Sequence, residues 1–278
     1  MYCDYHLHSA FSDDSDYPME DVIKDAITNG LDEICFTDHV DYGVKDEYDA
    51  PIHTSFLDGQ WIHNVDYPAY FKALEDLSIK YQSKIKIKKG LEFGMQKHTI
   101  KDFAKLYHKY EMDFILLSIH QIGDVEFWLN EFQKGKSQKE YNEAYYKELY
   151  YLVQNYKDYS VLGHMDLMRR YDMNGEYPFK KVEAIIAAIL KQVIKDERGI
   201  ELNTSSSRYG LKDTMPSKDI LKLYLDLGGK IITIGSDSHH PNHLGQGIKE
   251  AHSYLYSLGY RQFCTFKRMV PTFHDLQP

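Results

Sequence analysis

The chain has 278 residues, of which 43% are hydrophobic and 27% are charged, and its net charge at pH 7 is −9. This is an ordinary globular composition, without the basic balance expected of a sequence-independent nucleic-acid binder. No apolar run reaches membrane-spanning length and no basic leader precedes an apolar core, so we expect a cytoplasmic protein with neither a membrane nor a nucleic-acid partner. No composition break or long linker indicates a second unit, so we expect one domain over residues 1–278.

Short runs rich in Ile, Val, Leu and Phe predict buried parallel strands. Each run stops at polar residues, most often His, Asp or Glu. In chain order the seven runs are 1–8 (MYCDYHLH), 31–39 (LDEICFTDH), 85–94 (IKIKKGLEFG), 112–121 (MDFILLSIHQ), 159–167 (YSVLGHMDL), 199–207 (GIELNTSSS) and 230–240 (KIITIGSDSHH).

Helical patterns separate the predicted strands. The first covers 17–30, with Pro18 suited to its first turn and Gly30 to its C-terminal cap. The alternation predicts an α/β fold, a parallel barrel with right-handed crossovers. The connections 40–66 and 121–137 are long for such a fold, and we expect them to be substrate loops. The other predicted helices cover 67–82, 99–111, 138–157, 178–197, 216–228 and 246–259.

The ends of the predicted strands carry the candidate chemistry, because a β/α barrel places its site at the carboxyl ends of its strands. A histidine at one strand end is more often packed or hydrogen-bonded than metal-bound. Six such endings in one mouth would repel one another and be badly solvated unless cations held them together. The candidate metal ligands are His6, His8, Asp14, His39, Glu92, His120, His164, Asp237 and His239.

These donors are imidazoles and carboxylates, which suit catalytic Zn, Mn or Fe better than a structural zinc site built on thiolates. A catalytic metal uses about three protein ligands, so this set favours two or three divalent ions over one. Neighbouring metals activate a hydroxide and hold phosphoryl oxygens. A phosphate ester is therefore the expected substrate.

The ordered motifs resemble those of the PHP family, named for polymerases and histidinol phosphatases. HxH in the first strand is followed by TDH, Glu92, His120, His164 and a final SDSH. GHMDLMRRY and ELNTSSSR are similar to stretches of the histidinol-phosphatase branch. That branch implies a distorted, TIM-like (β/α)7 barrel with a three-metal centre. It also implies hydrolysis of L-histidinol phosphate to L-histidinol and phosphate, in L-histidine biosynthesis.

The resemblance assigns all of the candidate donors as metal ligands, with Glu92 bridging two metals. Many relatives have a histidine where this chain has Asp14. Aspartate is a harder donor, which could shift the preference towards Mn or Fe. Asp13 is the alternative ligand, but the spacing favours Asp14.

Phosphate contacts are expected from arginine, whose forked donors match phosphate oxygens, and from serine hydroxyls. Arg169 is the weaker candidate of an adjacent arginine pair. The expected substrate-binding residues are Arg170, Arg208, Ser205 and Ser207.

The candidate catalytic residues are Asp237 and His239, in the last motif. Either Asp237 or a metal-bound water would protonate the leaving alkoxide. The two long loops would recognise the imidazole and the amine of L-histidinol phosphate, with Asp41 and Glu126 as candidates for the amine.

Three other functions stay open at this point: a phosphotyrosine phosphatase, a DNA exonuclease and a non-catalytic PHP structural module. The negative charge argues against the exonuclease, and the complete donor set argues against the non-catalytic module. The sequence gives neither the physiological metal nor the oligomeric state.

Overall fold

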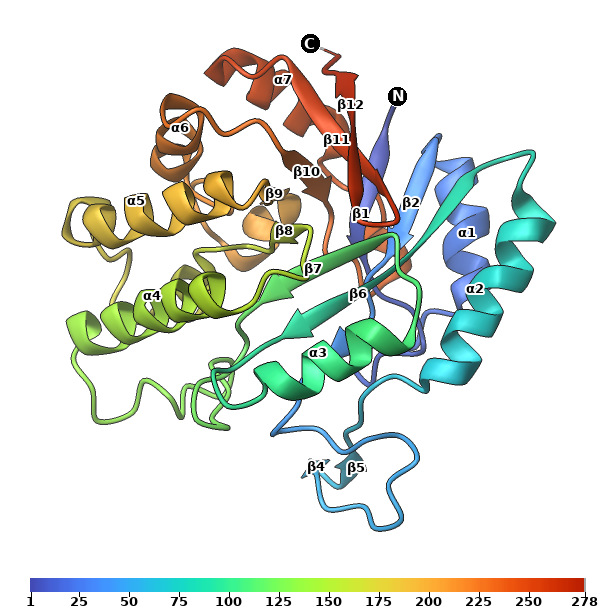
Figure 1. The fold of residues 1–278 in the computed structure, drawn as a ribbon, viewed down its shortest axis with the longest axis horizontal. Helices are drawn as coiled ribbons and strands as arrows, with labels where there is room; N and C mark the ends of the chain where they lie inside the picture. The colour runs from blue at the N-terminus through green and yellow to red at the C-terminus, as the bar shows by residue number, and fades with distance from the viewer. Residues whose placement is uncertain (278) are drawn as a thin grey trace.

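A nearly closed barrel of seven parallel strands, with helices around it, dominates the computed structural model, which describes residues 1–277 (Figure 1). The strands follow one another in the order β1-β2-β6-β7-β8-β9-β10. The Asp237 backbone N–H donates to the His6 carbonyl over 2.7 Å, which joins the last strand to the first. The predicted fold is confirmed. The strands are β1 (Cys3–Leu7), β2 (Glu33–Phe36), β6 (Lys86–Gly94), β7 (Phe114–Ser118), β8 (Val161–Leu162), β9 (Gly199–Asn203) and β10 (Ile232–Gly235).

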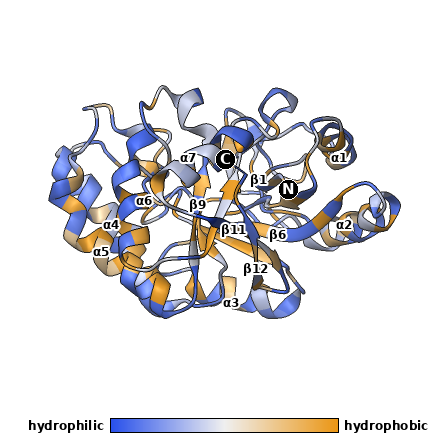
Figure 2. Cartoon of the chain, turned by 90° about the horizontal axis from the view of Figure 1, so that it is seen from above, coloured by the Kyte–Doolittle hydropathy of each residue, from blue (hydrophilic) through white to orange (hydrophobic). Residues whose placement is uncertain are grey.

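The predicted helices are all present, and their ends follow local signals. Ser137 begins one of them with a capping box, in which its side chain accepts from the Glu140 N–H and Glu140 bonds back to the Ser137 backbone. Apolar strands occupy the middle of the molecule, and the helices turn polar faces outward (Figure 2). The helices are α1 (Met19–Thr28), α2 (Tyr67–Tyr81), α3 (Ile100–Lys109), α4 (Gln138–Asn155), α5 (Phe179–Lys195), α6 (Lys218–Asp226) and α7 (Ile248–Leu258).

The second predicted strand is broken into two pieces. β2 ends at Phe36, and after Thr37 and Asp38 the short β3 (His39–Val40) continues along β6 in the register that β2 has with it. In that pairing His39 lies directly opposite Glu92. The continuation of the second strand along β6 therefore places His39 beside the glutamate at the centre of the barrel mouth.

Two hairpins were not predicted. The short hairpin of β4 (Phe56–Leu57) and β5 (Gln60–Trp61) lies within the loop 40–66 and projects below the barrel in Figure 1. The longer hairpin of β11 (Gln262–Lys267) and β12 (Val270–Asp275) follows the last helix. None of the helices within residues 1–277 is long and apolar enough to cross a lipid bilayer.

The β11–β12 hairpin covers the amino ends of the barrel strands. The Tyr5 hydroxyl accepts a hydrogen bond of 2.8 Å from the Phe266 N–H, and the Tyr5 ring packs edge-on against Phe114 at 5.1 Å. Met269 donates its N–H to the Asp113 carbonyl, just before β7. This end of the barrel is therefore filled by side chains, and the opposite end is left for the site.

A pH-dependent contribution to stability follows from His252 in α7. Its ring is fully buried between Tyr2 and Phe263, and its Nδ1 accepts from the Gln277 N–H. Burial, and to a smaller extent the N-terminal ammonium, lowers the pKa of His252 from 6.5 to about 4. The folded state thus keeps this ring neutral while the unfolded state protonates it, so stability is lost as pH falls from 6.5 towards 4.

We therefore expect the variant His252→Leu to lose less stability than the wild type between about pH 7 and about pH 5, by on the order of 1 kcal/mol. Denaturant unfolding at both pH values measures this difference. The variant His108→Leu, which removes an exposed histidine of α3, serves as the control. An equal pH dependence in His252→Leu and the wild type would contradict the prediction.

Candidate metal centre

Glu92 lies at the centre of a histidine cluster and is itself fully buried. Its Oε1 is 3.1 Å from His120 Nε2 and 3.0 Å from His164 Nε2. Its Oε2 is 3.1 Å from His6 Nε2 and 3.2 Å from His39 Nδ1. The two oxygens of this carboxylate thus face two different sets of imidazoles.

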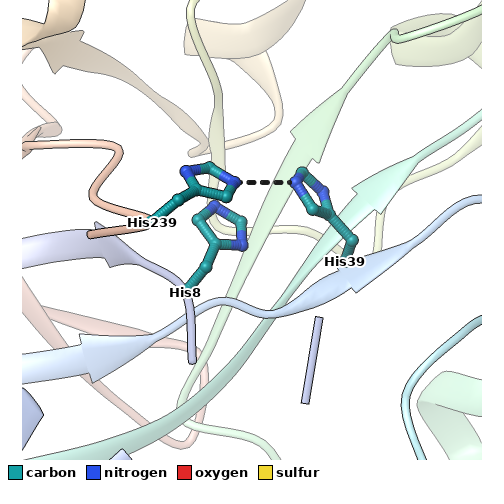
Figure 3. A group of neighbouring side chains, drawn as sticks. All are labelled: His8, His39 and His239. Atoms are coloured by element: carbon teal, nitrogen blue, oxygen red, sulfur yellow. Dashed lines mark hydrogen bonds between the residues drawn. The ribbon is translucent and has the colours of Figure 1, made fainter. Parts of the chain in front are cut away.

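His8 joins the cluster beside His6, because residues two apart on a strand point to the same side. Its ring stacks on His239 at 3.9 Å and on His39 at 4.2 Å (Figure 3). His39 Nε2 and His239 Nε2 are 3.3 Å apart. These three histidines come from the ends of β1 and β10 and from β3, so only the closed barrel brings them together.

Asp14, and not Asp13, reaches this group. Asp14 Oδ2 is 3.4 Å from His39 Nε2 and 3.3 Å from His239 Nε2, at the rim, where the side chain is 50% exposed. The Asp13 carboxylate turns away and accepts from Lys45 Nζ over 2.7 Å. Of the two aspartates, Asp14 is therefore the one that the structure places beside His39 and His239.

Asp237 lies between the cluster and an arginine. Its backbone has a φ of 55°, in the left-handed region that a non-glycine residue rarely adopts. Oδ1 is 3.7 Å from His6 Nε2, and Oδ2 accepts from Arg170 Nη2 over 2.9 Å. Burial would raise the pKa of Asp237, but His6, Arg170 and His239 hold it well below its ordinary value.

Two buried acids behind the cluster were not predicted to position ligands. Glu201 Oε1 is 2.7 Å from His6 Nδ1, and its Oε2 accepts from the backbone N–H of His164 over 2.8 Å. Asp41 Oδ1 is 2.7 Å from His120 Nδ1. Such contacts fix the ring orientation and leave the opposite nitrogen facing inward. A glutamate within the apolar run GIELN was a signal for Glu201.

The close approach of Asp41 explains a glycine at the end of β6. A Cβ added at Gly94 would lie 1.7 Å from Asp41 Oδ1 and 2.7 Å from His120 Nδ1. No larger residue fits there while this carboxylate holds the imidazole.

Asp38 and Asp166, which also follow strands, do not point into the cluster. Asp38 accepts from Ser12 Oγ over 2.8 Å, and Ser12 Oγ is 3.3 Å from His8 Nδ1, so Asp38 orients a ligand indirectly. Asp166 pairs with Arg169 at 3.0 Å. Arg169 also donates to the Thr214 carbonyl and to Glu176, so its contacts lead away from the site.

The donors fit divalent metal ions. His8 Nε2 and His39 Nδ1 are buried and have no hydrogen-bond partner within the described residues, and both face the Glu92 carboxylate. Burial alone would lower the pKa of His6, but Glu92, Glu201 and Asp237 raise it well above its ordinary value. These carboxylates give the site a negative field that a divalent cation would neutralise. Imidazole and carboxylate donors without thiolates are those of catalytic Zn, Mn or Fe.

A cavity of about 1210 Å³ opens from the cluster, and Arg170 and Arg208 are among its lining residues. Arg170 Nη2 donates to Ser205 Oγ over 2.8 Å, and its guanidinium lies 3.8 Å over the Tyr209 ring. Arg208 Nη2 donates to the Asp237 carbonyl over 2.8 Å. Ser207 is exposed and is not part of the lining. The structure thus brings together all the expected contacts except Ser207, although Ser205 faces Arg170 and not the open cavity.

A parallel barrel with this cluster at its carboxyl end matches the PHP domain family over residues 4–205, so the chain belongs to the PHP family. It is 31% identical to histidinol-phosphatase of Lactococcus lactis subsp. lactis, over 96% of this chain and 94% of that protein. It is also 31% identical to a probable histidinol-phosphatase of Clostridium acetobutylicum, over 90% of this chain and 91% of that one.

Solved structures agree with the fold. Histidinol phosphate phosphatase from Lactococcus lactis, in complex with zinc, L-histidinol and phosphate, has a TM-score of 0.82, 30% identity and 98% coverage of both chains. A putative histidinol phosphatase from Listeria monocytogenes has a TM-score of 0.75 over 88% of this chain and 98% of that one, at 20% identity. The family resemblance of the sequence motifs is confirmed.

A test of the site concerns Glu201. Glu201→Gln keeps the size of the side chain and removes the charge behind His6, so we expect metal affinity to fall roughly 10- to 100-fold while the fold is kept. Competition with a zinc chelator measures the affinity, and circular dichroism measures the fold. Glu33→Gln is the matched control, because Glu33 is also a buried strand glutamate but contacts Tyr5 instead of the cluster. Equal losses in both variants would refute the positioning role.

Proposed function

We propose that this chain is a metal-dependent histidinol-phosphatase that hydrolyses L-histidinol phosphate to L-histidinol and inorganic phosphate in L-histidine biosynthesis. The observation that carries the proposal is the Glu92-centred cluster, with its two carboxylate oxygens facing separate imidazole sets beside a cavity lined by two arginines. The likeness to the Lactococcus lactis histidinol-phosphatase over nearly the whole chain supports the same assignment.

Divalent ions would be held by the whole predicted donor set, with Glu92 shared between two of them. We propose three ions, of Zn, Mn or Fe, because the donors exceed what one or two catalytic metals use. When bound, these ions would supply Lewis acidity and an activated water for attack on phosphorus. The proposed ligands are His6, His8, Asp14, His39, Glu92, His120, His164, Asp237 and His239.

The arginines would bind the phosphate of the substrate. Arg170 Nε is buried and has no hydrogen-bond partner among the described residues, so it has a donor to offer. Ser205 accepts from Arg170 and donates to Asn203, so its role in the proposal is to orient the arginine. Arg208, held by the Asp237 carbonyl, would add a second charge to the phosphate side of the cavity.

The environment of Asp237 favours a ligand over a proton donor. Its Oδ2 accepts from Arg170, and with the pKa held low the carboxylate stays ionised and has no proton for the leaving alkoxide. His239 lies beside Asp14 at the rim of the cavity and would act as a ligand. We therefore assign the protonation of the leaving group to water at the site.

The substrate is tested by phosphate release from L-histidinol phosphate, phosphotyrosine and single-stranded DNA, with metals counted per chain. We expect L-histidinol phosphate to have by far the highest kcat/KM, with close to three metals bound. A metal count near one, or a clear preference for another ester, would overturn the assignment.

The shared carboxylate is tested by Glu92→Gln. An amide cannot place anionic oxygens in front of two imidazole sets, so we expect metal content to fall below that of the wild type and turnover to be abolished. Elemental analysis after dialysis gives the metal content, and Glu33→Gln again controls for the loss of a buried charge. Full activity with unchanged metal content would rule out the bridging role.

A further inference from the structure

Two loops form a wall of the cavity, and side chains of this wall are not among the proposed metal ligands. The β4–β5 hairpin contributes Trp61, and the loop after β7 contributes Glu126 and Trp128. Arg170 and Arg208 line the same cavity and come from segments after β8 and β9. The cavity is therefore lined by cationic groups from some loops and by an acid and two indoles from others.

The hairpin holds Trp61 in place through Asp46. The Asp46 carboxylate accepts from Trp61 Nε1 over 3.0 Å and from the backbone N–H groups of Thr54 and Ser55 over 2.6 and 3.0 Å. The exposed His53 stacks on the Trp61 ring at 3.7 Å and 7° between planes. One face of this fixed indole is thus covered by His53, with Tyr48 and His63 also against the ring, and the part of Trp61 that lines the cavity is the part that a ligand can reach.

Glu126 is tied to the cluster by the backbone. Gln121 and Glu126 form an antiparallel bridge, and the Phe127 N–H donates to the His120 carbonyl over 3.1 Å. The turn therefore places Glu126 in the cavity wall beside a proposed metal ligand.

The Glu126 carboxylate has no ion pair within residues 1–277. The lysine of this wall, Lys45, pairs instead with Asp13 at 2.7 Å and with Asp41 at 3.2 Å. Burial raises the pKa of Glu126 above its ordinary value, although the Trp128 indole, Lys45 and His120 act in the opposite direction. A cation from outside the protein would therefore be well bound here.

We infer that Glu126 binds the ammonium of the leaving alcohol and that Trp61 stacks on its imidazole, so that these two residues select L-histidinol phosphate among phosphate monoesters. This inference rests on the proposed function and adds its specificity. The substrate carries its phosphate and its ammonium on adjacent carbons. The arginines and metals would bind the phosphate, and the acid close to the metal ligands would bind the ammonium. The site is therefore complementary to both charges.

The ammonium contact is tested with Glu126→Gln, which keeps the shape and removes the charge. The substrates are L-histidinol phosphate and its desamino analogue, 3-(imidazol-4-yl)propyl phosphate. We expect the ratio of their kcat/KM values to fall roughly 10- to 100-fold, mainly through the KM of L-histidinol phosphate. Glu131→Gln is the matched control, because Glu131 is on the same loop but 58% exposed and outside the cavity lining. An unchanged ratio in Glu126→Gln would overturn the ammonium contact.

The stacking contact is tested with Trp61→Ala and Trp61→Phe. The comparison substrate is 2-aminopropyl phosphate, which keeps the ammonium and lacks the ring. We expect Trp61→Ala to lower the preference for L-histidinol phosphate at least about tenfold, and Trp61→Phe to restore most of it because a flat ring remains. Equal preference in Trp61→Ala and the wild type would overturn the stacking contact.

Calorimetric binding of L-histidinol separates this inference from the proposed function. Wild-type protein should bind L-histidinol more tightly than 3-(imidazol-4-yl)propanol, and Glu126→Gln should remove the difference. If the wild type binds with this preference but releases no phosphate from the ester, the proposed function fails and the inference stands. If the wild type turns over the ester but shows no such preference, or binds neither alcohol, the inference fails.

Discussion

The interaction on which the barrel mouth depends is that between the buried Glu92 carboxylate and the imidazoles that reach it from several strands. Removing a carboxylate from water is costly, and the cost is met only when partners of opposite charge surround it. Two of those partners are held from behind, His6 by Glu201 and His120 by Asp41. The orientation of these two rings is therefore fixed by the protein itself, as expected of imidazoles that hold a metal.

The two ends of the barrel differ in role: the amino end is packed with side chains that stabilise the fold, and the carboxyl end carries the site. At the amino end, the β11–β12 hairpin fills the barrel through Tyr5 and Phe266 and leaves no room for a ligand. At the carboxyl end, β3 places His39 beside Glu92, and the backbone at Asp237 is left-handed. Strain and unpaired nitrogens are found at this end, as expected where geometry serves function.

The cavity adds a second level of selection. In the proposed function, the cluster and its arginines bind phosphate, a group that many esters share. The wall formed by the loops after β3 and β7 carries Glu126 and Trp61, which match the cationic and aromatic parts of one leaving alcohol. Changes in those two loops could therefore change the substrate and leave the hydrolytic centre intact.

The sequence by itself determined the barrel, its helices and the donor set, because apolar runs that end in His, Asp or Glu repeat along the chain and parallel strands end on one side. It could not determine that β11 and β12 close the far end, or that Ser207 faces solvent, since these follow from non-local packing. The place of Glu201 behind His6, and the pairing of Asp13 with Lys45, were decided by the tertiary structure, because both contacts join residues far apart in the sequence.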